Sequence, residues 1–268
     1  METVITAVLI LAVTGTIAGL ALAVASKVFA VPVDEKAEKI RECLPGANCG
    51  ACGFSGCDGY AAALSKGETT NTALCNPGGN EASTAIAAIT GLSAGSVKPM
   101  AAVVLCQGHK DNASEKLVYQ GVQSCKMATQ LFGGPKDCIY GCVGMGDCVA
   151  ACPYDAIKLC NGVARINPLQ CRACKMCVNT CPKGIIKLMP LHEANAAVLC
   201  NNHDKGVLTM KECKAGCIGC KKCEKVCEAG AVTVTNNCAE VDFEKCTGCG
   251  KCHDACPKGA IDIIRLGL

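Results

Sequence analysis

Cysteine is the residue type that offers most chemistry in this chain, because 27 of its 268 residues are cysteines. Many of them are separated by only two or three residues, and proline follows several. Cysteines at such close spacing cannot all pair with good disulfide geometry, but together they can surround a metal. The spacing therefore predicts metal-bound thiolates and a reducing compartment.

Two runs of cysteines have the spacing C-x2-C-x2-C-x3-C-P, which holds [4Fe–4S] clusters in bacterial ferredoxins. They are Cys171, Cys174, Cys177 and Cys181 before Pro182, and Cys246, Cys249, Cys252 and Cys256 before Pro257. Two further runs are variants of this pattern. They are Cys217, Cys220, Cys223 and Cys227 before Glu228, and Cys138, Cys142, Cys148 and Cys152 before Pro153.

The four runs form an internal repeat with an offset of 75 residues. The offset relates Cys142 to Cys217, Cys148 to Cys223, Cys152 to Cys227, Cys171 to Cys246, Cys174 to Cys249, Cys177 to Cys252 and Cys181 to Cys256. Short β-prone segments follow at the same offset, at residues 156–159 and 231–234. Each copy is therefore predicted to be a compact ferredoxin-like module with two clusters, built from short strands and helical turns.

In such modules the fourth cysteine of one run binds the cluster of the other run. This rule predicts three complete ligand sets: Cys171, Cys174 and Cys177 with Cys152; Cys217, Cys220 and Cys223 with Cys256; and Cys246, Cys249 and Cys252 with Cys227. The fourth set, Cys142, Cys148 and Cys181, needs one more thiol, because Met145 stands where the second copy has Cys220. Cys138 is predicted to supply it, and Cys106 and Cys125 are the alternatives through a longer loop.

A fifth set, Cys49, Cys52, Cys57 and Cys75, precedes the repeat within LPGANCGACGFSGCDGY and CNPGG. The glycines let backbone N–H groups approach the sulfurs of a cluster. Zinc also accepts four thiolates, but zinc ribbons usually present two separated CxxC pairs, and the spacing here is uneven. Five [4Fe–4S] clusters are therefore predicted, with about twenty irons per chain from four irons in each.

Seven cysteines remain outside these sets: Cys43, Cys106, Cys125, Cys160, Cys200, Cys213 and Cys238. Free cysteines are commonly buried and pack like small apolar residues, which is the role expected for most of them. A sixth cluster held by Cys106, Cys125, Cys200 and Cys213 is the alternative.

Residues 3–26 carry no charged side chain and exceed the roughly 20 apolar residues that span a bilayer as a helix. A cleaved signal peptide is the alternative, but Met1-Glu2-Thr3 lacks a basic segment and the apolar stretch is too long. Residues 1–28 are thus predicted to be a single transmembrane anchor in the cell inner (cytoplasmic) membrane. Gly15 and Gly19 have the spacing that lets a second helix approach closely.

Basic residues follow this segment and none precedes it, which keeps the cysteine-rich body in the cytoplasm by the positive-inside rule. They are Lys27, Lys36, Lys39 and Arg41. The net charge of +3 gives no argument for binding nucleic acid.

The fold class expected is α+β, with the anchor, a small cysteine-rich [4Fe–4S] domain and two tandem ferredoxin-like modules. The expected bounds are 1–28 for the anchor, 29–95 for the cysteine-rich domain, 96–135 for a connecting segment, 136–190 for module 1 and 191–268 for module 2. With no Trp, four Tyr and four Phe, the chain lacks the side chains for a large aromatic core. Metal–thiolate bonds must then supply much of its stability.

The chain has one predicted helix, then the segments LPGANCGACG, GC and CNPGG, and then tandem ferredoxin motifs. In this order of features it resembles the RnfB family, the B subunits of the Rnf ion-translocating electron transport complexes. The resemblance implies that it accepts electrons from reduced ferredoxin and relays them towards NAD-reducing partner subunits. It also implies coupling to Na⁺ or H⁺ transport within a translocase. The alternatives are an iron–sulfur component of a membrane hydrogenase or dehydrogenase, and a zinc-binding scaffold.

No P-loop, GxGxxG motif or acid–base constellation is present, so no catalytic residues are predicted and NAD chemistry is expected in partner subunits. The four histidines, His109, His192, His203 and His253, lack metal-ligand spacing. Lysines lie beside the cysteine runs, and Lys221, Lys222 and Lys225 form the densest group. They are candidates for docking an acidic electron carrier.

Overall fold

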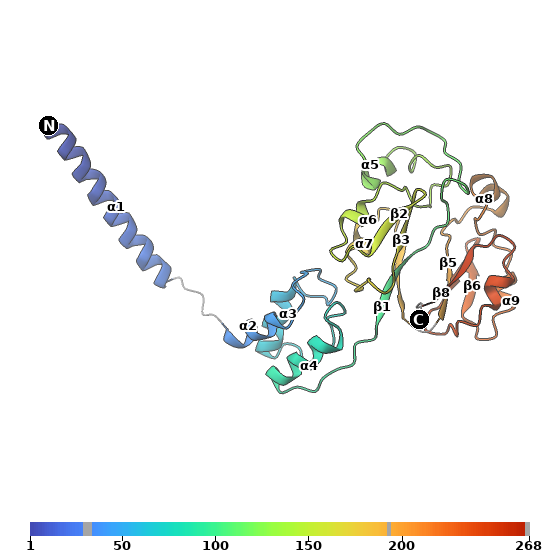
Figure 1. The fold of residues 1–268 in the computed structure, drawn as a ribbon, viewed down its shortest axis with the longest axis horizontal. Helices are drawn as coiled ribbons and strands as arrows, with labels where there is room; N and C mark the ends of the chain where they lie inside the picture. The colour runs from blue at the N-terminus through green and yellow to red at the C-terminus, as the bar shows by residue number, and fades with distance from the viewer. Residues whose placement is uncertain (29–33, 192–193, 266–268) are drawn as a thin grey trace.

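The computed structural model describes residues 1–28, 34–191 and 194–265. The expected start of the cysteine-rich domain at residue 29, the end of module 2 at residue 268 and His192 lie outside the described residues. The chain begins with an apolar helix, as the sequence predicts, and continues with a helical segment and two similar series of short strands and helices (Figure 1).

The N-terminal residues form one long helix, α1 (Glu2–Val28), which is long and apolar enough to cross a membrane. None of the span Ile5–Val28 is buried against the rest of the protein, and Figure 1 shows the helix lying apart. The hydroxyls of Thr14 and Thr16 donate to the carbonyls of Ile10 and Ala12, both at 2.8 Å. Polar groups inside the helix are therefore satisfied locally, as an apolar surrounding requires.

The cysteine-rich domain contains three helices, α2 (Glu35–Glu42), α3 (Cys57–Lys66) and α4 (Gly79–Thr90). Asp34 caps α2 by accepting hydrogen bonds from the N–H groups of Lys36 and Ala37, at 3.0 and 3.2 Å. The helices enclose a small core of buried residues: Ile40, Leu44, Cys57, Tyr60, Ala61, Leu64, Cys75 and Ile86. The cysteines are thus part of the only large apolar cluster found among the described residues of this domain.

The rest of the chain folds into two units with the same antiparallel strand pairing. In the first repeat unit (residues 100–190), β1 (Met100–Val104) pairs with β4 (Ile186–Pro190), and β2 (Ile157–Cys160) pairs with β3 (Val163–Ile166). In the second repeat unit (residues 194–265), β5 (Ala194–Val198) pairs with β8 (Ile261–Arg265), and β6 (Val232–Thr235) pairs with β7 (Cys238–Val241). The β-prone segments predicted at 156–159 and 231–234 are confirmed as β2 and β6, each one residue further along.

A short helix within each of the four cysteine runs carries the third cysteine of that run. These helices are α6 (Asp147–Ala150) and α7 (Met176–Thr180) in the first unit, and α9 (Lys222–Lys225) and α10 (Lys251–Asp254) in the second. The second unit also contains α8 (Gly206–Glu212), before its first run.

The segment 96–135 is not a simple connection, and that expectation was wrong. It supplies β1 to the first sheet and the short helix α5 (Cys125–Thr129). Strand β5 begins 94 residues after β1, whereas the other strands repeat after 75 residues, so the first unit holds 19 extra residues. These extra residues lie between Cys106 and Cys142, and α5 lies among them.

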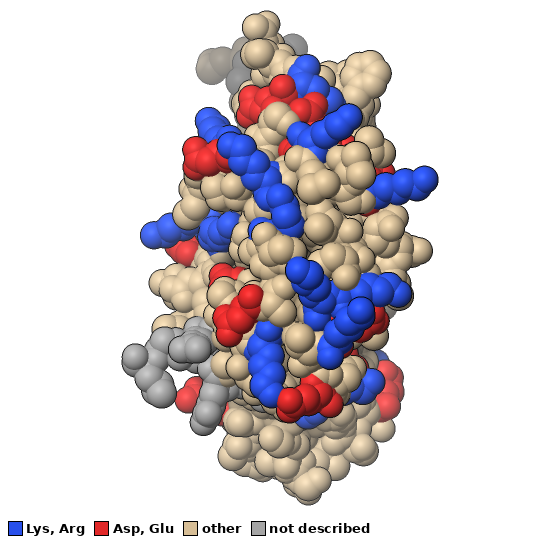
Figure 2. Space-filling model, turned by 90° about the vertical axis from the view of Figure 1, so that its right-hand side faces the viewer, with Lys and Arg blue, Asp and Glu red and all other residues tan. Residues whose placement is uncertain are grey.

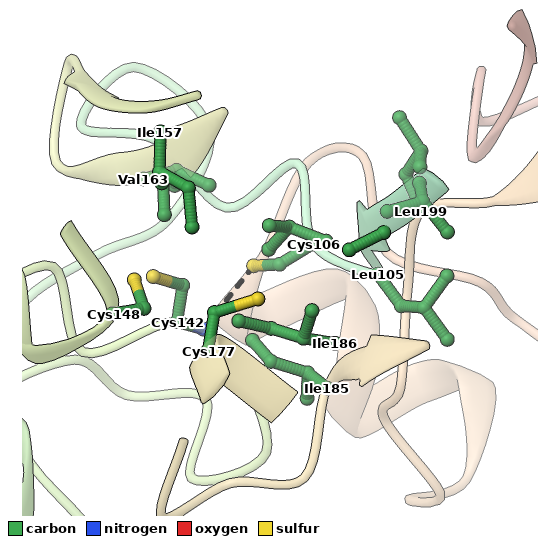
Figure 3. Packing of buried hydrophobic residues seen from close by; sticks show 14 of the residues in the cluster. Leu105, Cys106, Cys142, Cys148, Ile157, Val163, Cys177, Ile185, Ile186 and Leu199 are labelled. Carbon is green, nitrogen blue, oxygen red and sulfur yellow. Dashed lines mark hydrogen bonds between the residues drawn. The ribbon is translucent and has the colours of Figure 1, made fainter. Parts of the chain in front are cut away.

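Cysteines and small aliphatic residues together form the core of each unit. In the first unit, Cys106, Cys142, Cys148 and Cys177 are buried among Ile157, Val163, Ile185 and Ile186, among others (Figure 3). Figure 3 shows that the sulfurs of Cys142 and Cys148 lie close together. A core built this way depends on what the sulfurs bind as well as on apolar packing.

Removal of residues 1–28 should leave the iron content and the thermal unfolding temperature of the remaining protein unchanged, because the described body buries none of the α1 span. The shortened protein should no longer sediment with membranes. Iron analysis, circular dichroism and membrane flotation measure these three properties. A clear loss of iron would mean that α1 supports the body in a way that its exposure does not reveal.

Candidate metal centres

Three cavities in the two repeat units are each lined by four cysteines. They have nearly the same volume, about 340, 350 and 320 Å³ including their open mouths. Their cysteines are Cys125, Cys142, Cys148 and Cys181 in the first, Cys217, Cys220, Cys223 and Cys256 in the second, and Cys152, Cys171, Cys174 and Cys177 in the third. The equal donor sets fit one kind of occupant.

The crossing of the fourth cysteine between runs is visible in these cavities. Cys152 belongs to the first run but lies with the three leading cysteines of the second run. Cys181 and Cys256 cross in the opposite sense. The sets predicted around Cys171 and Cys217 are thus brought together as expected.

The structure brings Cys125, and not the predicted Cys138, together with Cys142, Cys148 and Cys181. Cys125 lines the same cavity as Cys142, Cys148 and Cys181, and its charge would interact directly with that of Cys148. Met145, which stands where the second copy has a cysteine, packs against the small cluster of Cys125, Ala128 and Val143. The 19-residue insertion therefore supplies the fourth thiol of this cavity, which Met145 cannot supply.

Asp147 fixes the position of Cys125. Its carboxylate accepts hydrogen bonds from the Ser124 hydroxyl at 2.9 Å and from the N–H groups of Cys125 and Lys126 at 2.9 and 3.1 Å. Burial alone would raise the pKa of Asp147, but these N–H donors outweigh it and lower the pKa. The ionised carboxylate thus satisfies the free N–H groups at the start of α5.

The fourth set of the repeat and the N-terminal set are also gathered. Cys227 and Cys246 lie near Cys252. Burial raises the pKa of Cys252, and the charges of these two cysteines raise it further. Cys249 is exposed on the loop between Cys246 and Cys252. In the cysteine-rich domain, burial raises the pKa of Cys75, and the charges of its three partners raise it further. Those partners are Cys57, Cys49 and Cys52.

The loops between the cysteines have backbone conformations suited to an anionic group. Left-handed residues occur at matching positions of all four loops: Gly144 and Gly146, Ala173 and Lys175, Gly219 and Lys221, and Gly248 and Gly250. Ala173, Lys175 and Lys221 adopt φ values of 52°, 61° and 59°, which are unusual for residues with a side chain. Alternating right- and left-handed residues point successive N–H groups into a concavity, which is a common binding arrangement for Fe–S clusters.

Backbone N–H groups already donate to several of the cysteine sulfurs. The first strand of each unit makes an equivalent bond, from Ala102 to Cys171 at 3.3 Å and from Ala196 to Cys246 at 3.5 Å. The N–H groups of Ala231 and Ala260 donate to Cys227 and Cys256, both at 3.3 Å. Such bonds stabilise negative charge on sulfur, so the donor sets fit clusters with thiolate ligands.

Burial keeps several of the free thiols protonated, whereas the hydrogen bond with the Cys238 thiol lowers the pKa of Cys217 to about 6. Burial raises the pKa of Cys148 and Cys177 to about 12 and that of Cys223 to about 11. Metal binding must therefore displace these protons, and it couples to folding because the site exists only in the folded chain. Among the residues that the structure describes, no three Cys, His, Asp or Glu side chains converge as ligands of one metal ion. A four-iron cluster instead takes one thiolate at each of four separate irons.

The sets lie next to one another. Cys49 of the N-terminal set is close enough to Cys174 to raise its pKa, after burial. The ring of Tyr154 lies near the same two cysteines and near Cys75, and its buried hydroxyl has no hydrogen-bond partner among the described residues. The set that contains Cys142, Cys148 and Cys181 lies next in space, because Cys177 lies near Cys148.

Cys138 lies elsewhere, near Cys106 and Cys200. Cys213 lies near the same two cysteines. The sixth set considered from the sequence contains three of these four cysteines and has Cys125 in the place of Cys138.

Three segments of the chain match known iron–sulfur families. Residues 44–77 match a family described as "Putative Fe-S cluster", and residues 168–184 and 239–262 match families described as "4Fe-4S binding domain". These segments contain cysteines of the N-terminal set and of both repeat units.

Several known proteins are similar over most of the chain. It is 42% identical over 238 residues to the B subunit of the Na(+)-translocating ferredoxin:NAD(+) oxidoreductase complex of Acetobacterium woodii, covering 88% of this chain and 71% of that protein. It is 40% identical over 243 residues to the B subunit of the ion-translocating oxidoreductase complex of Methanosarcina acetivorans, covering 90% and 91%. It is 38% identical over 243 residues to the B subunit of the proton-translocating ferredoxin:NAD(+) oxidoreductase complex of Clostridium ljungdahlii, covering 90% and 85%.

Replacement of Cys125 by Ala should remove about four irons per chain, the content of one cluster. The double variant Cys125→Ala with Met145→Cys should restore them, because residue 145 occupies the place that Cys220 has in the second unit. Iron and acid-labile sulfide are measured on anaerobically purified protein.

Cys160→Ala is the matched control, since Cys160 is exposed at the end of β2 and lines none of the three cavities. Full iron content in Cys125→Ala would exclude Cys125 as a ligand. Failure of Met145→Cys to restore iron would show that the first unit no longer accepts the geometry of the second.

Proposed function

Because this chain belongs to the RnfB family, the B subunits of ion-translocating oxidoreductase complexes, we propose that it relays electrons through [4Fe–4S] clusters inside such a complex. The family membership confirms the resemblance seen in the motifs. The single observation that best supports the relay is the series of neighbouring four-cysteine sites, which begins at Cys49 and continues through Cys174 and Cys177 to Cys148. A zinc scaffold would not need its sites to adjoin one another.

Five sets of thiolates are assigned to clusters, with Cys125 in place of Cys138. They are Cys49, Cys52, Cys57 and Cys75; Cys152, Cys171, Cys174 and Cys177; Cys125, Cys142, Cys148 and Cys181; Cys217, Cys220, Cys223 and Cys256; and Cys227, Cys246, Cys249 and Cys252. When bound, a [4Fe–4S] cluster takes up one electron and gives it to a neighbour, so that one centre is oxidised as the next is reduced. The chain itself binds the clusters, shields them from water and directs N–H groups at their sulfurs.

The donor and acceptor follow from the names of the relatives. Two of them are subunits of ferredoxin:NAD(+) oxidoreductase complexes, one Na(+)-translocating and one proton-translocating. We assign reduced ferredoxin as the electron donor and NAD-reducing partner subunits as the destination. In this assignment the chain is one component of a translocase and contains no complete active site.

The helix α1 is assigned as a single-pass anchor, with the cysteine-rich body on the cytoplasmic side. Lys27 lies in its last turn, and Lys36, Lys39 and Arg41 follow in α2, as the positive-inside rule requires for this orientation. Gly15 and Gly19 have no neighbouring atoms within 4 Å beyond the helix backbone. They leave a smooth surface on which a helix of another protein in the complex can pack.

The assigned docking site for ferredoxin is the lysine group on α9 and the residue before it: Lys221, Lys222 and Lys225. All three are exposed, and none of the ion pairs among the described residues includes them. Lys251, in contrast, is paired with Glu228. Figure 2 shows many lysines on this side of the molecule, with acidic residues between them. Free positive charge beside Cys220 and Cys223 would attract an acidic carrier to a cluster.

The function is tested by mixing the anaerobically purified protein with reduced ferredoxin. The protein should be brown, and its visible absorbance should fall as the clusters accept electrons, on the time scale of mixing. Colourless protein that contains zinc would contradict the proposal and favour the scaffold. Brown protein that takes electrons from dithionite but not from ferredoxin would leave the clusters in place and exclude ferredoxin as the donor.

Replacement of Lys221, Lys222 and Lys225 by Gln should slow electron uptake from ferredoxin about 3- to 10-fold at low salt, because charge attraction speeds such encounters. The difference should shrink near 0.5 M salt, where the Debye length is about 4 Å. Stopped-flow absorbance at several salt concentrations measures the rate, after the iron content of each variant has been checked.

The control triple Lys98→Gln, Lys187→Gln and Lys245→Gln removes the same charge. Each of these lysines is paired with a carboxylate, namely Glu244, Glu240 and Asp242 respectively. Equal slowing in both triples would indicate a general charge effect. No slowing in the first triple would place the docking site away from α9.

A further inference from the structure

Four cysteines outside the five assigned sets meet where the two repeat units face each other. Cys106 follows β1 and Cys138 is the first cysteine of the first run, both in the first unit. Cys200 follows β5 and Cys213 ends α8, both in the second unit. Cys106 and Cys200 each lie near both Cys138 and Cys213, so that the pairs from the two units face one another.

The sulfurs of Cys106 and Cys200 accept equivalent backbone hydrogen bonds. The N–H of Cys142 donates to the Cys106 sulfur at 3.3 Å (Figure 3), and the N–H of Cys217 donates to the Cys200 sulfur at 3.2 Å. The residue two positions after each cysteine donates to the same sulfur, Gly108 to Cys106 at 3.3 Å and Asn202 to Cys200 at 3.5 Å. The sulfurs of Cys106 and Cys200 thus accept backbone N–H hydrogen bonds in the same way as sulfurs of the assigned sites.

Glycines leave room beside these sulfurs. A Cβ atom on Gly141 would lie 3.4 Å from the Cys106 sulfur and 3.6 Å from the Cys138 sulfur. A Cβ atom on Gly108 would lie 3.4 Å from the Cys106 sulfur and 3.9 Å from the Cys213 sulfur. The absence of side chains at both glycines keeps the space around three of the four thiols free of carbon.

Buried polar groups surround this place. Asn202 is 1% exposed, and its side-chain amide donates to the Cys138 sulfur at 3.5 Å. Lys136 is 6% exposed, and its ammonium donates to the carbonyls of Gly108 and Gly162 at 2.7 and 2.9 Å.

The Lys136 charge needs a partner. It interacts with Cys213 and with Cys142, but no ion pair among the described residues includes it. A buried ammonium without a carboxylate is costly unless other negative charge lies nearby. Thiolates that bind clusters on either side of Lys136 supply this negative charge.

We propose that Cys106, Cys138, Cys200 and Cys213 hold a sixth [4Fe–4S] cluster between the two repeat units. This corrects two expectations from the sequence, that Cys138 completes the irregular set and that a sixth set would contain Cys125. It also gives Cys213 a ligand role that matches Cys138, since the two are 75 residues apart.

The position of this site gives it a role that rests on the proposed electron relay. Cys106 is hydrogen-bonded to Cys142 of one assigned set, and Cys200 is hydrogen-bonded to Cys217 of another. A cluster there adjoins one site of each repeat unit. It therefore completes an uninterrupted series from the N-terminal set to the second unit.

The test is the metal content of the full-length protein, purified anaerobically and reconstituted with iron and sulfide. Six clusters require about twenty-four irons and twenty-four sulfides per chain, against about twenty of each for five. Cys213→Ala and Cys138→Ser should each lose about four irons, and the double variant should lose no more than either single variant. Mössbauer spectra should lose about one sixth of the [4Fe–4S] signal in the same variants.

Cys160→Ala serves again as the control and should keep the parental content. A parent with about twenty irons would overturn the proposal while leaving the electron relay intact. Full parental iron in both single variants, or a loss of eight irons in the double variant, would also overturn it. One zinc per chain that disappears in Cys213→Ala would replace the proposed cluster by a zinc site. A parent that binds no iron would instead refute the proposed function as a whole.

Discussion

The bond between cysteine sulfur and metal is the interaction on which this structure depends. The chain has no Trp and only eight Tyr and Phe together, and the cores of the repeat units consist mainly of Ala, Val, Ile and Cys. Strands of four or five residues in two-stranded sheets are not stable alone in water. The buried thiols add little to packing beyond that of a small apolar side chain. Their value comes from ligation, which joins segments as far apart as Cys125 and Cys181 and so couples metal binding to folding.

Two copies of one unit, which differ at the site around Cys142, account for most of the architecture. The two units agree in strand pairing, in the positions of left-handed residues and in the N–H groups directed at sulfur. They differ where Met145 replaces a cysteine and where 19 extra residues precede Cys142. The insertion contributes Cys125, and Asp147 holds it in place through three hydrogen bonds. In the structure, Cys125 from the insertion thus lies where the first loop lacks a cysteine, and the connection is longer and less regular than in the second unit.

The sequence alone predicts the anchor, the repeat, the crossing of ligands and the strands β2 and β6, because each depends on residues close together in the chain. The offset of 75 also predicts which cysteines are equivalent. It cannot predict Cys125 as a ligand, because the insertion has no counterpart in the second copy with which to compare it. It also cannot place Cys138 with Cys106, Cys200 and Cys213, since spacing rules describe one loop at a time and this contact depends on how two units pack. Strand β1 was missed for a related reason, as its partner β4 lies more than eighty residues away.

The left-handed loop residues distinguish sites that are otherwise alike. At equivalent positions, the first unit has Gly146 and Lys175, whereas the second has Lys221 and Gly250. Each unit therefore places a lysine in the loop of one of its two sites and a glycine in the loop of the other. A fixed positive charge beside a cluster favours the reduced, more negative state and raises the reduction potential of that cluster. The left-handed lysines add to positive charge that other lysines already bring to the sites, since Lys183 lines the cavity of Cys142 and Lys251 interacts with Cys249. The two units thus carry this added charge at opposite sites: Lys175 lines the cavity of the second run in the first unit, and Lys221 lines that of the first run in the second unit.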